Sequence, residues 1–197
     1  MRNKMGTFCM ILGAGLVIAA LLLFGWNQWE AWRAEQFTGT ALPALIEESR
    51  KSASGDLVSL DPDMTEVMID GYGYIGYLSI PSLNLELPVM SEWDYARLRI
   101  SPCWYFGSTK TGNLVIAAHN YTRHFGLLSE LSPGNTVYFT DMDGIVTRYT
   151  VAEVDVLAPT DVEKMTDGKY ELTLFTCTYG GRSRVTVRCD QVEQDAE

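Results

Sequence analysis

Histidine and cysteine are scarce in this chain of 197 residues, which contains two His and four Cys. The cysteines form no Cys-x-x-Cys pair and no Cys/His cluster, so their spacing excludes a zinc site of the common structural kinds. Lys and Arg form no run, and the formal net charge is −10. An acidic chain without a basic patch is a poor binder of nucleic acid. We therefore expect no metal, no other cofactor and no nucleic-acid partner.

Charged residues are absent from residues 5–26, a run of 22 residues. As a helix this run measures roughly 33 Å, which is enough to cross the hydrocarbon core of a bilayer. Arg2 and Lys4 precede it, and the positive-inside rule then places the N-terminus in the cytoplasm and the rest of the chain outside. A cleaved signal peptide is the alternative, but the run ends in LLLFGW rather than in a small-x-small cleavage site. The sequence thus predicts a single-pass membrane anchor with an extracellular domain.

The segments that follow the anchor differ in pattern. Residues 27–51 read as a helix on which Trp29, Trp32 and Phe37 roughly share one side. This aromatic side suits either a stalk at the membrane interface or a surface that binds a partner. Residues 52–70 have few periodic apolar positions and read as a linker. The expected divisions are a cytoplasmic N-terminus (1–4), the anchor (5–26), a juxtamembrane helix and linker (27–70), a β-domain (71–192) and an acidic tail (193–197).

From Gly71 onward, short apolar runs alternate with turn residues, which is the pattern of β-strands. So many short strands with little helix predict a mainly β fold, either a closed barrel of seven or eight strands or a sandwich. Asp141 and Asp143 would suit calcium, but an Asp-Gly turn at 143–144 explains them more simply. The expected strands cover 75–81, 85–90, 113–118, 136–141, 147–158, 171–176 and 184–189. Short helices or helical turns are expected at 91–99, 122–131 and 160–166.

The last two expected strands flank a turn-rich segment, TYGGRS (178–183). A hairpin around this turn brings Cys177 opposite Arg184. The same register pairs Leu174 with Val187 on an apolar face and leaves the thiol and the guanidinium on the other face. A cation beside a cysteine lowers the pKa of the thiol and raises the fraction of reactive thiolate. An inert cysteine beside a surface arginine fits the same pattern.

A nucleophilic thiol requires a partner for proton transfer, and histidine is the usual one. His119 directly follows the strand-like run NLVIAA, so it lies where a strand opens into a loop. The other histidine, His124, lies inside the segment TRHFGLL and has the weaker position. Outside the cytoplasm a disulfide between Cys103 and Cys189 would be allowed. Whether these two cysteines come within bonding distance does not follow from the sequence.

Four segments, in order, resemble the sortase family, the membrane-anchored cysteine transpeptidases of Gram-positive bacteria. TLFTC followed by R-x-x-V resembles the TLxTC…R signature of that family, and NLVIAAHNYTRHFGLLSEL resembles its catalytic-histidine segment. IGYLSIPSLNLELPV resembles its opening strands, and GNTVYFTDMDGIVTRYTV resembles the hairpin after the histidine segment. Together the segments cover about residues 72–190. Ala118, directly before the histidine, departs from the glycine of many relatives.

The resemblance implies a sortase-type closed β-barrel and assigns roles to three residues. Cys177 would be the nucleophile, His119 the general acid and base, and Arg184 the arginine that faces the thiol. Arg182 and Arg188 lie close by in the sequence, but only Arg184 is opposite the cysteine in the expected register. The candidate substrate-binding residues are Thr176, Tyr121 and Trp104.

The implied reaction is a two-step acyl transfer. The enzyme would cleave an LPxTG-like sorting motif near the C-terminus of a surface protein. It would then join the acyl product to an amine of a cell-wall precursor or of another protein, such as a pilin. A cysteine peptidase that only hydrolyses and a noncatalytic, membrane-tethered β-domain for surface assembly are the two alternatives. The exact motif, and the choice between wall anchoring and pilus polymerisation, do not follow from the sequence.

Overall fold

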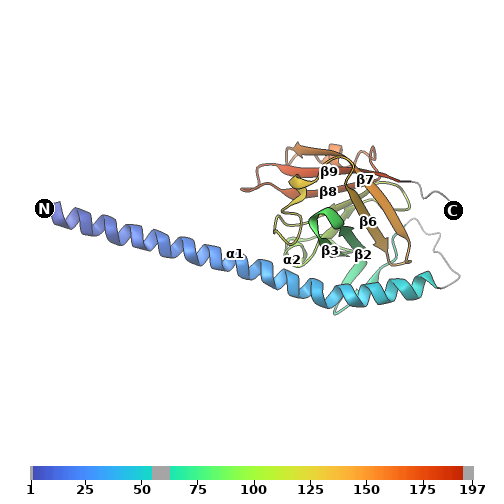
Figure 1. Cartoon of the computed structure of the whole chain (residues 1–197), viewed down its shortest axis with the longest axis horizontal. Helices are drawn as coiled ribbons and strands as arrows, with labels where there is room; N and C mark the ends of the chain where they lie inside the picture. The colour runs from blue at the N-terminus through green and yellow to red at the C-terminus, as the bar shows by residue number, and fades with distance from the viewer. Residues whose placement is uncertain (1, 55–62, 193–197) are drawn as a thin grey trace.

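The structure is a computed structural model of the whole chain, and it describes residues 2–54 and 63–192. A long helix, α1 (Arg2–Ala53), leads from the N-terminus to a β-barrel and runs along one side of it (Figure 1). Residues 1, 55–62 and 193–197 lie outside the described part of the chain. They include part of the expected linker and the whole of the expected acidic tail.

In the described part of the chain, nine strands form one sheet in the order β1-β2-β3-β4-β5-β8-β9-β7-β6. A further antiparallel pairing, between β2 and β6, closes β2 to β9 into a barrel of eight strands, and β1 pairs with β2 outside this ring. The predicted closed barrel is therefore confirmed, and the sandwich is wrong. The strands are β1 (Val67–Ile69), β2 (Tyr72–Ile80), β3 (Leu85–Met90), β4 (Cys103–Phe106), β5 (Leu114–Ala117), β6 (Thr136–Asp141), β7 (Val146–Leu157), β8 (Leu172–Cys177) and β9 (Arg184–Gln191).

Short helical segments and turns lie in these connections between strands, as expected. Within 91–99 only one turn is α-helical, and within 122–131 hydrogen-bonded turns precede a single 3-10 turn. The sequence pattern also missed β4, a run of four apolar residues, and β1, which lies in the segment read as a linker. The helical segments are η1 (Pro81–Leu83), α2 (Tyr95–Leu98), η2 (Leu128–Glu130) and α3 (Val162–Thr166).

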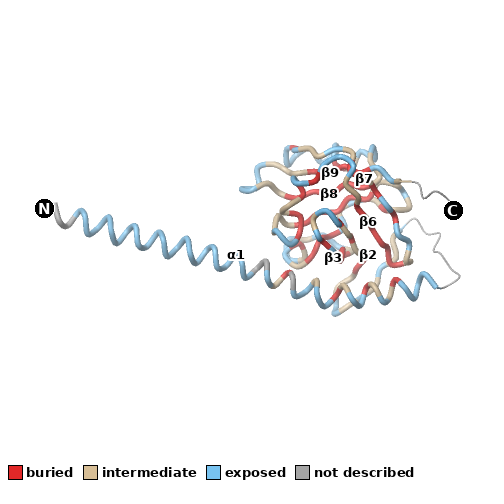
Figure 2. The backbone as a smooth tube through the Cα atoms, viewed as in Figure 1, coloured by how far each residue is buried: buried red, intermediate tan, exposed pale blue. Residues whose placement is uncertain are grey.

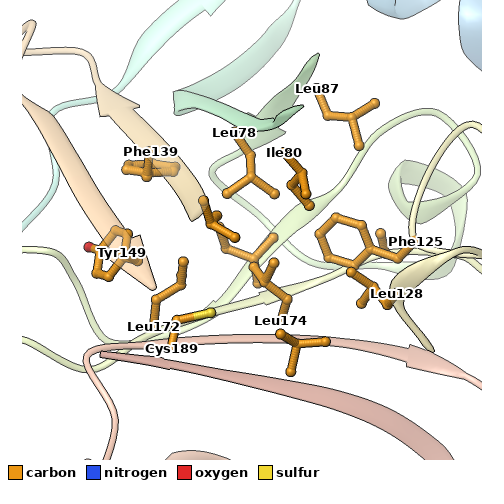
Figure 3. Packing of buried hydrophobic residues seen from close by; sticks show 14 of the residues in the cluster. Leu78, Ile80, Leu87, Phe125, Leu128, Phe139, Tyr149, Leu172, Leu174 and Cys189 are labelled. Atoms are coloured by element: carbon orange, nitrogen blue, oxygen red, sulfur yellow. The ribbon is translucent and has the colours of Figure 1, made fainter. Parts of the chain in front are cut away.

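The barrel interior is filled by apolar side chains that converge from most of its strands (Figure 3). Ile116 of β5, Leu174 of β8 and Val187 of β9 are all fully buried there, so three neighbouring strands share one inward apolar face. Along the backbone, buried positions concentrate on the strands and exposed ones on the connecting loops (Figure 2). Burial of each such side chain stabilises the fold by roughly 1.5–3 kcal/mol. These three strands are therefore firmly held, and the candidate site lies at their ends.

The C-terminal half of α1 packs against the barrel. Ala34, Ala41, Leu45 and Ser49 are buried, and their spacing places them on one side of the helix. The helix contacts β1, β2 and β3. Gly144, in the turn between β6 and β7, lies so close to the helix that an added Cβ would lie 2.5 Å from the carbonyl oxygen of Ser49. The barrel and this half of α1 thus form one packed body.

The apolar run and the segment 27–51 form a single continuous helix, α1. Among the described residues it is the one helix long and apolar enough to cross a membrane, and the side chains of its apolar part are exposed. The helix bends in its docked half (Figure 1). Pro43, inside the helix, lacks the amide hydrogen that would donate to the carbonyl of Gly39, and this missing bond accounts for the bend.

Candidate active site

β8 and β9 form the hairpin that the sequence predicts, in the predicted register. Leu174 lies opposite Val187, and Cys177 lies opposite Arg184 in the last pair of the ladder before the turn. The cysteine therefore occupies the final position of a strand in a closed barrel. There the backbone is paired with β9, while the side chain remains half-buried rather than fully covered.

Side chains alternate between the two faces of β8, and Cys177 lies on the outer one. Leu174 belongs to the barrel core, whereas Thr173 and Phe175 share the outer face with Cys177. The ring of Phe175 meets the ring of Tyr105 on β4 nearly edge-on, with centroids 5.1 Å apart. The thiol thus has an aromatic neighbour two residues before it on the same face of its own strand.

The parallel pairing of β5 with β8 directs His119 toward the end of β8 that carries Cys177. The last residue of β5, Ala117, pairs with Phe175. A parallel register continued two residues past this pair would place His119 level with Cys177 and on the same face of the sheet. In the sequence, β6, β7 and α3 lie between the strand that precedes His119 and the strand that ends at Cys177. Their approach depends on barrel closure rather than on any local motif.

Two hydrogen bonds fix the step from β5 into the segment that carries His119. The amide of Ala118 donates to the carbonyl of Phe175 at 3.2 Å, and the hydroxyl of Thr176 donates to the carbonyl of Ala118 at 2.8 Å. Thr176 is buried on the inner face of β8, opposite to the face of Cys177. The structure thus places Thr176 beneath the site, where it positions the histidine segment and does not line a substrate surface.

The ring of Tyr121 stacks on the ring of His119, with centroids 5.0 Å apart and an interplanar angle of 30°. Backbone hydrogen bonds close this segment, from the amide of Phe125 to the carbonyl of His119 at 3.1 Å and from the amide of Gly126 to the carbonyl of Tyr121 at 2.9 Å. An added Cβ on Gly126 would lie 2.7 Å from the carbonyl oxygen of Tyr121, so this turn requires glycine. Tyr121 therefore orients the half-buried imidazole.

The second histidine, His124, is buried. Its side chain is 1% exposed, and neither ring nitrogen makes a hydrogen bond of normal geometry within the described residues. Burial lowers the pKa of His124 to about 4, and the charge of His119 acts in the same direction, against a weaker opposing effect of the Ile100 backbone. At neutral pH His124 is uncharged and lies beside Tyr121, with ring centroids 5.5 Å apart. Only His119 is open enough to exchange protons with a substrate.

The guanidinium of Arg184 is held at the turn that follows Cys177. Its Nη1 donates to the carbonyls of Gly181 and Ser183, both at 3.1 Å. The turn is itself braced across its base, because the amide of Thr178 donates to the carbonyl of Ser183 at 3.0 Å and the amide of Ser183 donates to the hydroxyl of Thr178 at 3.1 Å. Within the described residues only Nη1 of Arg184 is engaged, so its Nε and Nη2 groups are available to a substrate.

The two neighbouring arginines are placed differently. Arg182 is exposed in the turn. Arg188 is 5% exposed, and its guanidinium donates to the hydroxyl of Thr173 at 3.1 Å and to the carbonyl of Lys164 in α3. Arg188 thus fastens α3 onto the outer face of β8 and β9. The geometry favours Arg184 over both neighbours as the arginine beside the thiol.

Trp104 lies away from the thiol. Its neighbour on β4, Cys103, pairs with Ala117 and belongs to the same buried cluster as Phe175, so the indole of Trp104 points to the opposite face. The indole Nε1 donates to the carbonyl of Gly107 at 2.6 Å. With Met64, Phe106 and other residues, Trp104 lines a pocket of about 450 Å³ to which none of Cys177, His119 and Arg184 contributes. The structure therefore does not bring Trp104 together with the candidate nucleophile.

Cys103 and Cys189 are free thiols. Both side chains are fully buried, and they belong to different core clusters. Burial raises the pKa of each thiol to about 12. The disulfide that the sequence allowed is therefore not formed, and these two thiols stay protonated and inert. Cys177 is the half-exposed thiol of the barrel.

The acidic residues of the turn between β6 and β7 are used by the turn itself. Asp141 Oδ1 accepts from the amides of Asp143 at 3.1 Å and Ile145 at 2.9 Å. The carboxylate of Asp143 pairs with Lys110 at 3.2 Å. Within residues 2–54 and 63–192, no group of three or more His, Cys, Asp or Glu is placed to hold a metal ion.

A thiol with a proton-transfer partner and a fixed cation beside it carries out the chemistry of cysteine enzymes that transfer acyl groups. Residues 78–192 match the model of the sortase domain family. This match covers more than half of the chain, and the chain belongs to the sortase family, whose members are cysteine transpeptidases. The family resemblance seen in the sequence is thereby confirmed.

Relatives of known structure or activity share this family. The chain is 28% identical over 188 residues to Sortase A from Bacillus anthracis, with 89% of each chain covered. Its fold is similar to that of a lid mutant of sortase A from Corynebacterium diphtheriae, with a TM-score of 0.57, 21% identity and coverage of 80% of this chain and 97% of that one. Sortase C from Clostridium perfringens, solved with the C-terminal cell wall sorting motif, gives a TM-score of 0.55 and 20% identity, over 76% of this chain and 88% of that one.

Proposed function

We propose that this protein cleaves an LPxTG-like sorting motif outside the cytoplasm and joins the new acyl end to an amine. The observation that carries the proposal is the last pair of the β8–β9 ladder, in which Cys177 lies opposite Arg184. The parallel pairing of β5 with β8, which directs His119 toward the same end of the sheet, supports it further. A half-buried thiol, a cation and an imidazole are the groups that acyl transfer requires.

In the first step the thiolate of Cys177 attacks the carbonyl carbon of the scissile peptide bond and forms a carbon–sulfur bond. The carbonyl oxygen becomes an oxyanion, which accepts hydrogen bonds from the free N–H groups of Arg184. The carbon–nitrogen bond then breaks, and protonated His119 donates its proton to the leaving amine. The products of this step are a thioester on Cys177 and the released C-terminal fragment.

In the second step an incoming amine attacks the carbonyl carbon of the thioester. Neutral His119 accepts the proton that the amine loses, Arg184 again binds the oxyanion, and the carbon–sulfur bond breaks. A new amide bond forms and Cys177 returns to its thiolate. Tyr121, stacked on the imidazole, keeps His119 in one orientation through both proton transfers.

The clients of this reaction are surface proteins that carry a C-terminal sorting signal, and the acceptor is an amine of a cell-wall precursor or of a pilin. Sortase C from Clostridium perfringens was solved with a C-terminal cell wall sorting motif, which supports this substrate class. Arg2 and Lys4 before the apolar run support an N-terminus in the cytoplasm and a barrel outside. The membrane is a partner through α1.

The test uses the full chain in lipid nanodiscs, a panel of sorting-motif pentapeptides and a panel of amines, with products identified by mass spectrometry. The wild-type protein is expected to give both a cleaved peptide and an amine-joined peptide, and Cys177→Ala is expected to give neither. Cys9→Ala is the matched control, because it removes a thiol in the apolar part of α1 and should leave both products. Formation of either product by Cys177→Ala would disprove the proposal.

The same reaction distinguishes the alternatives. A hydrolytic peptidase gives the cleaved peptide and no joined product, however much amine is added. A noncatalytic domain gives no product with any peptide, and its Cys177 is not acylated by a thiol-directed peptide mimic. Only formation of the joined product supports a transpeptidase.

A further inference from the structure

The site lies at the end of the barrel that faces the apolar half of α1. β9 runs from Arg184 to Gln191, away from the side of the molecule on which α1 begins (Figure 1). The β8–β9 turn (residues 178–183) and the start of β9 therefore lie at the end of the barrel nearest the apolar part of α1. β5 runs parallel to β8, so the segment that starts at His119 opens at this same end.

The length of α1 fixes how far this end lies from the membrane. The apolar run of about 33 Å is long enough to span a hydrocarbon core of roughly 30 Å. Trp26 and Trp29 are exposed at the end of the run, where aromatic side chains favour the membrane interface. Ala34 is the first fully buried side chain of α1 among those described. It lies eight residues after Trp26, which is roughly 12 Å along a helix.

The barrel cannot swing freely on this helix. α1 continues without interruption from the apolar run into the part that is packed on β1, β2 and β3. Leu45 and Ser49 are buried in this contact, and the turn at Gly144 closes against the end of the helix. The orientation of the helix in the membrane is therefore transmitted to the barrel.

The β8–β9 turn has a tip suited to lipid headgroups. Tyr179 is 89% exposed, although its aromatic ring is large and apolar. Gly180 and Gly181 follow with φ of 82° and 70°, which lets the chain reverse tightly behind the tyrosine. Arg182 is exposed next to them. A tyrosine and an arginine at an exposed tip match the mixed apolar and anionic character of a membrane interface.

From these observations we infer that the Cys177 end of the barrel rests on the surface of the bilayer that α1 crosses, with Tyr179 inserted at the headgroup level. The contact is defined by the docked helix and does not depend on catalysis.

The test places one fluorophore in the full chain, either in the β8–β9 turn or near the C-terminal end of β9. In a Cys9→Ser, Cys177→Ala background the remaining thiols are buried, so Tyr179→Cys or Asp190→Cys carries the label alone. The protein is inserted into phosphatidylethanolamine–phosphatidylglycerol nanodiscs that contain headgroup-nitroxide lipid. Quenching at position 179 is expected to exceed that at position 190 by about threefold or more, because only the first lies at the interface. Equal quenching at both positions would overturn the inference.

A second variant lifts the barrel without turning it. Seven helix-forming residues inserted between Trp32 and Arg33 lengthen α1 by roughly 10 Å and rotate the barrel by only about 20°. Quenching at position 179 should then fall to the level at position 190. Quenching that persists after the insertion contradicts the inference. If this variant does not fold, the comparison of positions 179 and 190 in the native-length chain decides alone. Neither measurement involves turnover, so the outcome is independent of the proposed function.

Discussion

The hydroxyl of Thr176 donates to the carbonyl of Ala118 at 2.8 Å, and this bond joins the strand that ends at Cys177 to the strand that ends before His119. The two residues lie directly before the candidate nucleophile and the candidate acid–base. One buried hydrogen bond thus couples the positions of both groups, although neither Thr176 nor Ala118 faces the outer surface.

Replacement of Thr176 by valine keeps the shape of the side chain and removes this bond. We expect kcat to fall about tenfold with KM little changed, and the free energy of unfolding to fall by about 1 kcal/mol. The pH profile of kcat should shift, because the imidazole is no longer held in place. Thr176→Ser, which retains the hydroxyl, should restore most of the rate. A normal pH profile and rate for Thr176→Val would show that the bond is only structural.

Replacement of Arg184 by lysine keeps the charge and loses the planar set of N–H donors. An ammonium at this position cannot bind the turn carbonyls and an oxyanion with the same geometry, so kcat/KM should fall by about 100-fold or more. Arg182→Lys is the matched control from the same turn, and it should behave as the wild type because Arg182 is exposed. Steady-state kinetics with one peptide and one amine check both variants.

Replacement of His124 by leucine should flatten the pH dependence of stability. The pKa of His124 is lowered to about 4 from 6.5, so the folded protein binds fewer protons than the unfolded chain between these values. The wild type therefore loses roughly 3 kcal/mol of unfolding free energy from this group as the pH falls from 7 to 4, and none of it above pH 7. Urea unfolding of both proteins at several pH values measures the difference. If the unfolding free energy of the two proteins changed with pH in the same way, His124 would not be the source of this pH dependence.

Replacement of Arg188 by methionine should destabilise the fold by about 2–4 kcal/mol, because the buried hydroxyl of Thr173 and the carbonyl of Lys164 lose their donor. Arg182→Met, in the exposed turn, should change stability by less than about 0.5 kcal/mol. Thermal unfolding gives both values. Equal effects at the two positions would show that Arg188 does not fasten α3 to the sheet.

The three cysteines of the barrel should differ in how readily their thiols are alkylated. Iodoacetamide is expected to modify Cys177 in the folded protein, while Cys103 and Cys189 react only in denaturant, because burial raises the pKa of each to about 12. Peptide mapping by mass spectrometry identifies the modified positions. Labelling of Cys103 in the folded protein would contradict the packing around β4.

The register of the β8–β9 hairpin could be predicted because it depends on local information. Side chains alternate with a period of two, and a short turn rich in glycine leaves few ways to pair the flanking strands. Cys177 and Arg184 therefore follow from the sequence as neighbours. His119 could be placed at a strand end, but its approach to Cys177 depends on parallel pairing between distant strands. The family resemblance, and not the local pattern, supplied that pairing.

Other features depend on contacts that a local pattern does not contain. The role of Arg188 is set by α3, which packs onto it from the connection between β7 and β8. Trp104 was assigned to the substrate surface as an aromatic residue, but its face of β4 could not be known while β4 itself went undetected. The connection after His119 reads as helical because its apolar spacing suits a helix, yet the Gly126 turn interrupts it.

The parallel pairing of β5 with β8 also governs when the enzyme can first act during folding. The chain that connects these strands contains β6, β7 and α3, so their contact is non-local and carries a large loop-closure entropy. The long helix can form early from local contacts, whereas the candidate nucleophile and the candidate acid–base are brought toward one another only when the sheet closes. Turnover in a refolding experiment should therefore appear together with the slow, cooperative phase. A partly folded chain, in which β5 and β8 have not yet paired, would have no catalytic activity.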